Sequence, residues 1–145
     1  MKKAIIVLAI FSSLLLSGCS LLEEVNSSLE YANKATEHIN TWQDFGQEAP
    51  QLIQEAATNL DSKEELEKEL HVLLDEIEEF NEADPPAIAE DLHQQIVEKN
   101  EELQKVIDSA MVNGELALEK LQNSELFQLI NEVTTLMNVV EDLGL

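Results

Sequence analysis

The chain has 145 residues and a formal net charge of −22, with 30 aspartates and glutamates against 8 basic residues. All eight basic residues are lysines, so the bidentate guanidinium group that usually recognises phosphate is absent. A chain of this charge repels the phosphate backbone, which excludes nucleic acid as a partner. The acidic residues are expected to form a solvated surface that favours solubility.

Residues 1–18 have the pattern of a signal peptide that is removed from the mature protein. Met1-Lys2-Lys3 is a basic start, and an apolar stretch interrupted only by two serines runs from Ala4 to Leu16. This stretch is too short to span a membrane, because a spanning helix needs roughly 20 apolar residues whereas the core of a signal peptide needs about 7 to 15.

The sequence Leu16-Ser17-Gly18-Cys19 has the apolar, small, small, cysteine order of a lipobox. It predicts cleavage between Gly18 and Cys19 and an S-diacylglycerol group on Cys19, with N-acylation left open. Two or three acyl chains of the palmitate kind hold a protein durably on a membrane. We therefore expect residues 19–145 to form a single domain, lipid-anchored at the extracytoplasmic face of the cell membrane.

A first amphipathic helix is predicted to begin almost at the lipid, with no flexible linker. Its apolar face repeats every three or four residues and continues into the aromatic residues, namely Leu22, Val25, Leu29, Ala32, Thr36, Ile39, Trp42 and Phe45. Trp42, Phe45 and Tyr31 are predicted to belong to the core rather than to an exposed recognition patch. Gly46 and the Ala49-Pro50 step are expected to end this helix, and a short second helix to follow over residues 52–60.

The next two helices have clearer signals. Ser62 and Glu65 have the spacing of a capping box, with Asp61 as an alternative cap, and an apolar face follows at Leu66, Leu70, Leu73, Ile77 and Phe80. Asp84-Pro85-Pro86 is expected to separate this helix from another, which Asn113-Gly114 ends. The core positions of that helix are predicted to be Ile88, Leu92, Ile96, Leu103, Ile107 and Ala110.

The C-terminal part predicts a short helical turn around Leu116–Leu121 and a last helix capped by Asn123 or Ser124, and no segment predicts a sheet. The apolar face of the last helix is Leu126, Ile130, Val133, Met137 and Val140. The expected fold is therefore all-α, an antiparallel helical bundle of three long and one or two short helices. A looser or dimeric coiled arrangement is the alternative.

Two patterns contain residues that can bind metals, and both are incomplete. Glu67, His71 and Asp75 recur every four residues along one helical stripe. Glu90 and His93 are three residues apart, as in di-iron carboxylate bundles, but such sites need a second motif and two further glutamates. We expect solvated side chains at all five positions and no metal site.

Catalytic motifs are missing as well. Cys19 is expected to be acylated, and there is no GxSxG motif, glycine-rich phosphate loop or glycine-containing acidic calcium loop. The sequence therefore predicts a protein that is not an enzyme and has no cofactor.

The lipobox, the run from Glu24 to Asn33 (EVNSSLEYAN) and the run from Pro86 to Ile96 (PAIAEDLHQQI) give the chain a resemblance to a family. It resembles small uncharacterised lipoproteins of endospore-forming Gram-positive bacteria, over its whole length. The resemblance implies a location on the outer surface of the cell membrane and assigns a role only to Cys19. It implies no activity.

Two functional hypotheses follow. The first is a non-catalytic helical interaction module, which a lipid anchor holds near a protein partner at the membrane surface. The alternative is an envelope protein that binds cations or cationic peptides, because removal of Lys2 and Lys3 with the signal peptide changes the formal charge from −22 to −24.

Overall fold

The computed structural model describes residues 18–142, with side chains from residue 25 onward. Residues 1–17 of the predicted signal peptide and the side chain of Cys19 lie outside the described residues. The three long helices are α2 (Gly18–Ala56), α3 (Leu60–Asn81) and α4 (Glu90–Ala110). The shorter elements are η1 (Ala87–Ala89), β1 (Met111–Val112), β2 (Glu115–Leu116), α5 (Leu118–Gln122), α6 (Leu126–Thr135) and α7 (Met137–Asp142).

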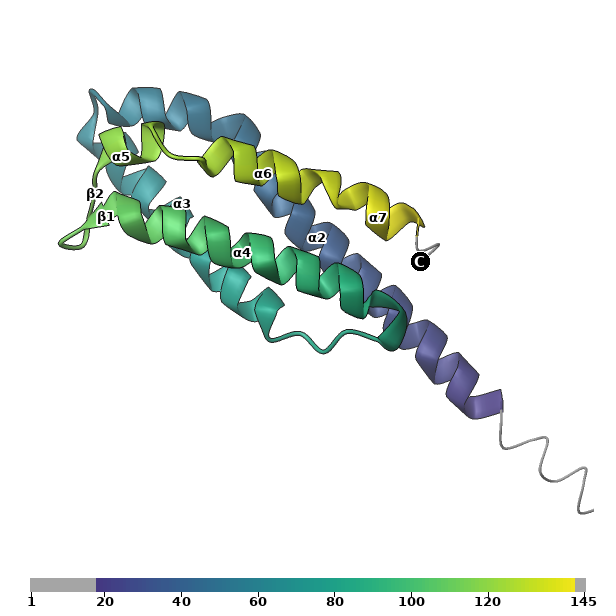
Figure 1. Cartoon of the computed structure of the whole chain (residues 1–145). Coiled ribbons are helices and arrows are strands. Elements are labelled where there is room, and N and C mark those ends of the chain that lie inside the picture. Colours follow the sequence, from purple (N-terminus) through teal and green to yellow (C-terminus); the bar gives the residue numbers. More distant parts are fainter. Residues whose placement is uncertain (1–17, 143–145) are drawn as a thin grey trace, which may run out of the picture.

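The long helices pack side by side and run in alternating directions, which confirms the predicted all-α antiparallel bundle (Figure 1). Helix α2 contacts both α3 and α6, and α4 contacts the same two helices from the opposite side. Helices α6 and α7 together therefore form the fourth side of the bundle. Among residues 18–142, no helix combines the length and apolarity that crossing a membrane requires.

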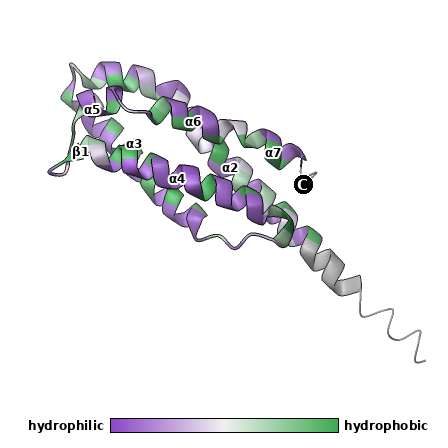
Figure 2. Cartoon of the chain, in the orientation of Figure 1, coloured by the Kyte–Doolittle hydropathy of each residue, from purple (hydrophilic) through white to green (hydrophobic). Residues whose placement is uncertain are grey.

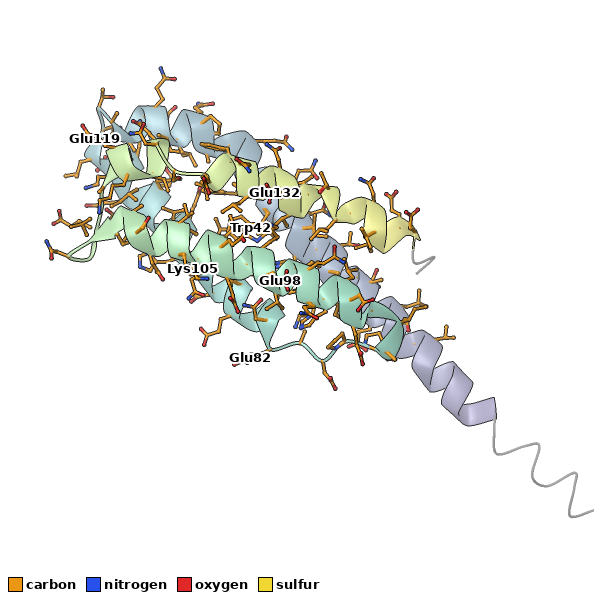
Figure 3. The ribbon with its side chains drawn as sticks, viewed as in Figure 1. Trp42, Glu82, Glu98, Lys105, Glu119 and Glu132 are labelled. Atoms are coloured by element: carbon orange, nitrogen blue, oxygen red, sulfur yellow. The ribbon has the colours of Figure 1, made fainter. Side chains whose placement is uncertain are left out.

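The core lies along the axis between these helices, and the hydrophilic residues cover the outside (Figure 2). The apolar faces predicted for α3 and for most of α4 are buried, as their spacing requires. Trp42 points into the middle of the bundle, whereas the labelled glutamates and Lys105 lie around its outside (Figure 3). The largest fully buried side chains are Trp42, Phe80, Ile39, Leu66, Leu70, Ile77, Ile96, Leu103, Ile107, Leu121, Leu126 and Val133.

The prediction of a break at Ala49-Pro50 was wrong, because α2 continues through Pro50 to Ala56 as one helix. Pro50 cannot donate the hydrogen bond that would reach back to Gly46, and the ribbon of α2 bends along its length (Figure 1). The small residues Gly46 and Ala49 let α6 approach closely, so a Cβ added at Gly46 would lie 2.7 Å from Cγ2 of Ile130. Packing against α6 thus holds the helix together despite the proline.

Smaller corrections concern helix ends and one apolar residue. Asn59, not Ser62, caps α3, since its side chain accepts a hydrogen bond from the Asp61 N–H at 2.9 Å. The last predicted helix is divided at Leu136 into α6 and α7. At its start, the Ser124 hydroxyl accepts a hydrogen bond from the Leu126 N–H at 3.3 Å. Ile88, predicted to be core, is exposed in η1.

The expectation that no segment forms a sheet was wrong, because a hairpin of two short strands joins α4 to α5. Met111 pairs with Leu116 and Val112 pairs with Glu115. Asn113 and Gly114 form the turn with φ angles of 55° and 84°, the left-handed conformation that two-residue hairpin turns need. The Asn-Gly sequence therefore builds a hairpin turn in addition to following the helix end.

Candidate functional site

Glu67, His71 and Asp75 do not gather into a group that could hold a metal ion in the described part of the chain. The Glu67 carboxylate accepts a hydrogen bond from the Leu116 N–H at 2.8 Å and lies 3.8 Å from the Lys63 ammonium. The exposed His71 donates from Nδ1 to the Glu67 backbone carbonyl at 2.7 Å, and Asp75 is exposed one turn further. Glu67 thus ties the hairpin to α3, which is a structural role.

Glu90 and His93 also point to different surroundings. Glu90 is exposed at the start of α4, whereas His93 packs edge-on against Tyr31, with its Nδ1 3.1 Å from the tyrosine hydroxyl. Burial lowers the pKa of His93, and the negative charge of Asp84 opposes this shift. Across residues 25–142, no three histidine, aspartate or glutamate side chains gather in a group that could hold a metal ion.

The most unusual group in the core is a set of three polar side chains from three helices, which we call the polar layer: His38 of α2, Asn81 of α3 and Asn100 of α4. His38 donates from Nε2 to Oδ1 of Asn100 at 2.9 Å, and Asn100 donates from Nδ2 to Oδ1 of Asn81 at 2.8 Å. His38 is 4% exposed and Asn100 is fully buried. The chain of hydrogen bonds fixes which helix positions face one another.

The ring of His38 stacks on Phe80 with its centroid 4.3 Å away, so the imidazole is held on one face as well as at Nε2. Burial lowers the pKa of His38, the hydrogen bond to Asn100 opposes this, and the positive charge of Lys34 lowers it further. Burial and the charge of Lys34 favour a neutral ring, and the hydrogen bond to Oδ1 of Asn100 places its proton on Nε2. Nδ1 of His38 is buried and has no hydrogen-bond partner among the described residues.

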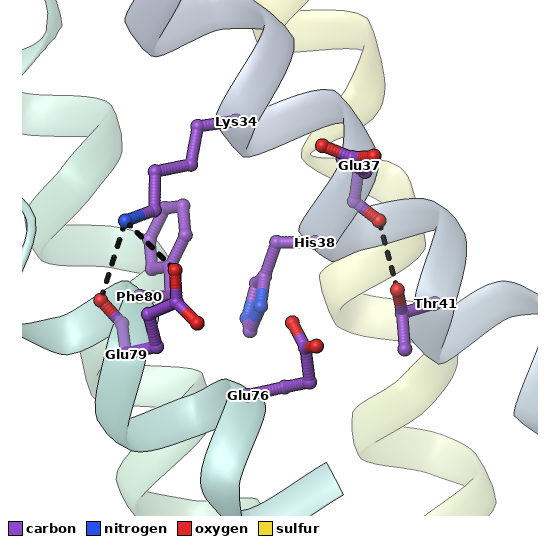
Figure 4. Close-up of a pocket in the computed structure, with 7 residues that line it drawn as sticks. All are labelled: Lys34, Glu37, His38, Thr41, Glu76, Glu79 and Phe80. Carbon is purple, nitrogen blue, oxygen red and sulfur yellow. Dashed lines mark hydrogen bonds and ion pairs between the residues drawn. The ribbon is translucent and has the colours of Figure 1, made fainter. Parts of the chain in front are cut away.

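A groove of about 330 Å³ opens over His38 between α2 and α3 (Figure 4). Lys34 lies on one side, 3.6 Å from the Glu79 carboxylate and 3.5 Å from the Glu79 carbonyl. The Glu76 carboxylate lies beside the imidazole, and the Thr41 hydroxyl donates to the carbonyl of Glu37 at 3.0 Å. We call this the His38 groove, lined by Lys34, Glu37, His38, Thr41, Glu76, Glu79 and Phe80.

None of the predicted metal ligands lies in the His38 groove, and the residues that build it were not predicted as a site. One signal was present: Asn100 stands between Ile96 and Leu103, at a position where the spacing of α4 requires a core residue. In α2, His38 is itself buried and comes directly before the buried Ile39. The hydrogen bond between His38 and Asn100 joins residues 62 positions apart in the sequence, so only the folded structure reveals it.

The aromatic residues of α2 form part of the core, as predicted. Tyr31, Trp42 and Phe45 are all buried, and Trp42 and Phe45 pack edge to face with ring centroids 6.4 Å apart. Cys19 lies within the range of α2, but the lipid on its side chain and the cleavage after Gly18 remain predictions.

Comparisons with known proteins give two matches. The profile of a family of unknown function, DUF6376, matches residues 31–143. The chain is also 34% identical to a protein of Bacillus subtilis (strain 168) described as the uncharacterized lipoprotein YybP, in an alignment of 147 residues that covers 99% of both chains. No solved structure matches the chain.

Proposed function

The chain belongs to the DUF6376 family of unknown function, and from this premise we propose that it is a lipid-anchored, non-catalytic interaction module on the extracytoplasmic face of the cell membrane. The description of the Bacillus subtilis relative as a lipoprotein supports the anchor, and so does the lipobox that ends at Cys19. A protein of this kind acts by holding a binding surface at a fixed distance from the bilayer.

The observation that carries this proposal is the unbroken course of α2 from Gly18 into the core. A helix rises about 1.5 Å per residue, so Tyr31 lies about 18 Å along the axis from Cys19. Many anchored proteins have a flexible tether at this place, whereas here the first turns are helical. The bundle is therefore held near the membrane surface, and its partner is expected to be there too.

The end of the bundle next to the anchor is suited to such contacts. Helix α2 projects beyond the other helices at this end (Figure 1), and it carries the exposed apolar side chains of Val25 and Leu29. Two of the candidate metal ligands have structural contacts instead: Glu67 holds the hairpin and His93 contacts Tyr31. These roles support a non-catalytic function.

Fractionation and intact mass test the anchor. The wild-type chain is expected in the membrane fraction with a diacyl or triacyl mass starting at Cys19. A Cys19→Ala variant is expected to be released, or kept as an uncut precursor. An unmodified Cys19 in soluble protein would contradict the proposal.

Site-specific photo-crosslinking in cells tests the interaction module. A photoreactive residue at Leu29, next to the anchor, is expected to capture a specific membrane-surface protein. The matched control is Val112, which is also exposed but lies in the hairpin at the opposite end of the bundle. Equal yields of the same adducts from both positions would indicate non-specific proximity and count against the module.

A further inference from the structure

The surface of α2 differs between the side that faces α3 and the side that faces α6. Toward α3, Glu37 and Glu48 line grooves together with acidic residues of that helix. Toward α6, Gln43 and Gln47 line a groove of about 260 Å³. The other residues of this groove are also uncharged, namely Gly46, Phe127, Ile130, Asn131 and Thr134. Because the chain has a formal charge of −22, this uncharged side is where another acidic molecule meets the least repulsion.

The uncharged side of α2 carries a side-chain amide every seven residues. We call this row the amide seam, and its members are Asn26, Asn33, Asn40, Gln47 and Gln54. All five side chains are exposed, and none forms a side-chain hydrogen bond within residues 25–142. Positions seven residues apart lie almost in line along a helix, which is the spacing that two helices share when they wind around each other. The seam is therefore suited to contact with a second helix.

The chemistry of the amide seam makes it complementary to itself. Each amide has an oxygen that accepts hydrogen bonds and an NH₂ group that donates them, so two facing amides can satisfy each other. All five amides face an amide at once only if the second helix has the same seven-residue spacing, as another copy of α2 has. The seam thus fits a second copy of this chain better than an unrelated helix.

The carboxylates beside the seam favour one direction of pairing. Glu30, Glu37 and Asp44 follow the first three amides by four residues, so they flank the seam. In a parallel pair of helices this flank faces the positions that directly precede each amide, which here are the uncharged Val25, Ala32 and Ile39. In an antiparallel pair the two acidic flanks would face each other.

We infer that two copies of this chain pair through the amide seams of their α2 helices, parallel and in register, on the membrane surface. The inference rests on the proposed function for its lipid anchor, and it names the partner of the interaction module as a second copy. Cys19 would hold the start of each α2 at the same membrane surface. Residues with the same number then lie at the same height, as pairing in register requires.

The size of the seam indicates why the membrane matters for this pairing. From Asn26 to Gln54 the seam is about 42 Å long, so a contact one helix wide, roughly 10 Å, covers about 400 Å² on each copy. Stable pairs of soluble proteins usually bury about 800 Å² on each partner. The pairing is therefore weak in solution, and the anchors strengthen it because they confine both copies to one surface.

Disulfide crosslinking of the full chain in isolated membranes tests the pairing. The sulfur of Cys19 carries the lipid in the proposed mature form, so an introduced cysteine is the free thiol. Gln47→Cys is expected to give a dimer of twice the mass of the chain, because facing seam positions bring the two Cα atoms within the roughly 7 Å that a disulfide needs. Glu48→Cys is the matched control, since Glu48 is also exposed but lies on the α3 side. Its dimer yield is expected to be at least about fivefold lower, because its Cα atoms are too far apart.

Two differently tagged variants in one cell test the direction of the helices. Asn33→Cys is expected to crosslink to Asn33→Cys, and Gln47→Cys to Gln47→Cys, because a parallel pair in register brings like positions together. A predominant crosslink between Asn33→Cys and Gln47→Cys would show an antiparallel pair and overturn the proposed register.

A change of charge at the centre of the seam separates pairing from folding. In the Gln47→Cys chain, Asn40→Asp is expected to lower the dimer yield about tenfold, because two carboxylates then face each other. Co-expression with a Gln47→Cys chain that carries Asn40→Lys should restore the dimer as a mixed pair. A yield that Asn40→Lys does not restore would show that position 40 does not face its counterpart.

Failure of this inference can be told apart from failure of the proposed function. Equal dimer yields from Gln47→Cys and Glu48→Cys would indicate random collisions, and a photo-crosslinked adduct at Leu29 with another protein alone would indicate a different partner. With Cys19 acylated, either result would overturn the inference and leave the anchored module standing. An unmodified Cys19 in soluble protein would overturn both together.

Discussion

The two parts of α2 share one helical periodicity but differ in what covers them. Residues 31–49 pack against α3 and α6 and bury Trp42 and Ile39 completely. Earlier along the helix, Val25 and Leu29 have the same apolar character and remain 57% and 47% exposed. This difference in exposure shows that apolar spacing indicates a helix face, whereas the ends of the neighbouring helices decide how much of that face is buried.

The largest effect is expected where the buried part of α2 loses its biggest side chain. Trp42→Ala should lower the free energy of unfolding by about 3–5 kcal/mol, because it leaves a cavity among fully buried neighbours. Urea denaturation followed by circular dichroism measures this, since the variant lacks the single tryptophan. A loss below about 1 kcal/mol would mean that Trp42 lies in an exposed patch after all.

The next largest loss of stability is expected in the polar layer. Asn100→Ala should cost about 1–3 kcal/mol, because it leaves the His38 Nε2–H and the Asn81 carbonyl without their partner. The double variant His38→Leu/Asn100→Leu removes both ends of the buried hydrogen bond and should recover much of that loss. Additive costs in the double variant would show that the two side chains do not interact.

The pH dependence of stability tests the protonation state of His38 in the same layer. Burial lowers the pKa of His38 below its ordinary value of 6.5, so the unfolded chain binds a proton at this residue before the folded chain does. The stabilising effect of a neutral His38 is therefore complete above pH 6.5 and declines as the pH falls through 6.5 toward the folded pKa. His38→Gln should reduce this decline in urea titrations at several pH values.

The matched control for the pH experiment is His71→Gln, which changes an exposed histidine of α3. It should keep the wild-type slope below pH 6.5. His93, whose pKa burial also lowers, contributes in the same direction in both variants and cancels in the comparison. Identical slopes in His38→Gln and the wild type would contradict a neutral buried His38.

The close approach of α2 and α6 gives a smaller expected effect with two opposing parts. Gly46→Ala improves helix propensity by about 1 kcal/mol, but the new methyl group meets Ile130 at 2.7 Å, and overpacking costs about 1–3 kcal/mol. We expect a net loss of about 1 kcal/mol in thermal or urea unfolding. Combined with Ile130→Ala, the same change should become neutral or stabilising. A stabilising Gly46→Ala single variant would place α6 further from α2.

These contrasts also show how far sequence alone reaches. The faces of α3 and α4 could be predicted because Leu66–Phe80 and Leu92–Ala110 keep core spacing over several turns. The continuation of α2 through Pro50 could not, since it depends on the packing of α6 against Gly46. The His38 groove was equally hidden, because its central hydrogen bond joins α2 to α4 across the core.

The smallest effect is expected at the exposed start of α2. Leu29→Ala should change the free energy of unfolding by no more than about 0.5 kcal/mol, because an exposed side chain loses little on truncation. Ile39→Ala, ten residues further along the same helix, is the matched control and should cost about 2–5 kcal/mol. If Leu29→Ala were as destabilising as the control, a second copy of the chain or another partner would have to cover the start of α2. If it is neutral while a photoreactive residue at position 29 captures a partner, the first turns serve binding and the rest of the helix serves folding.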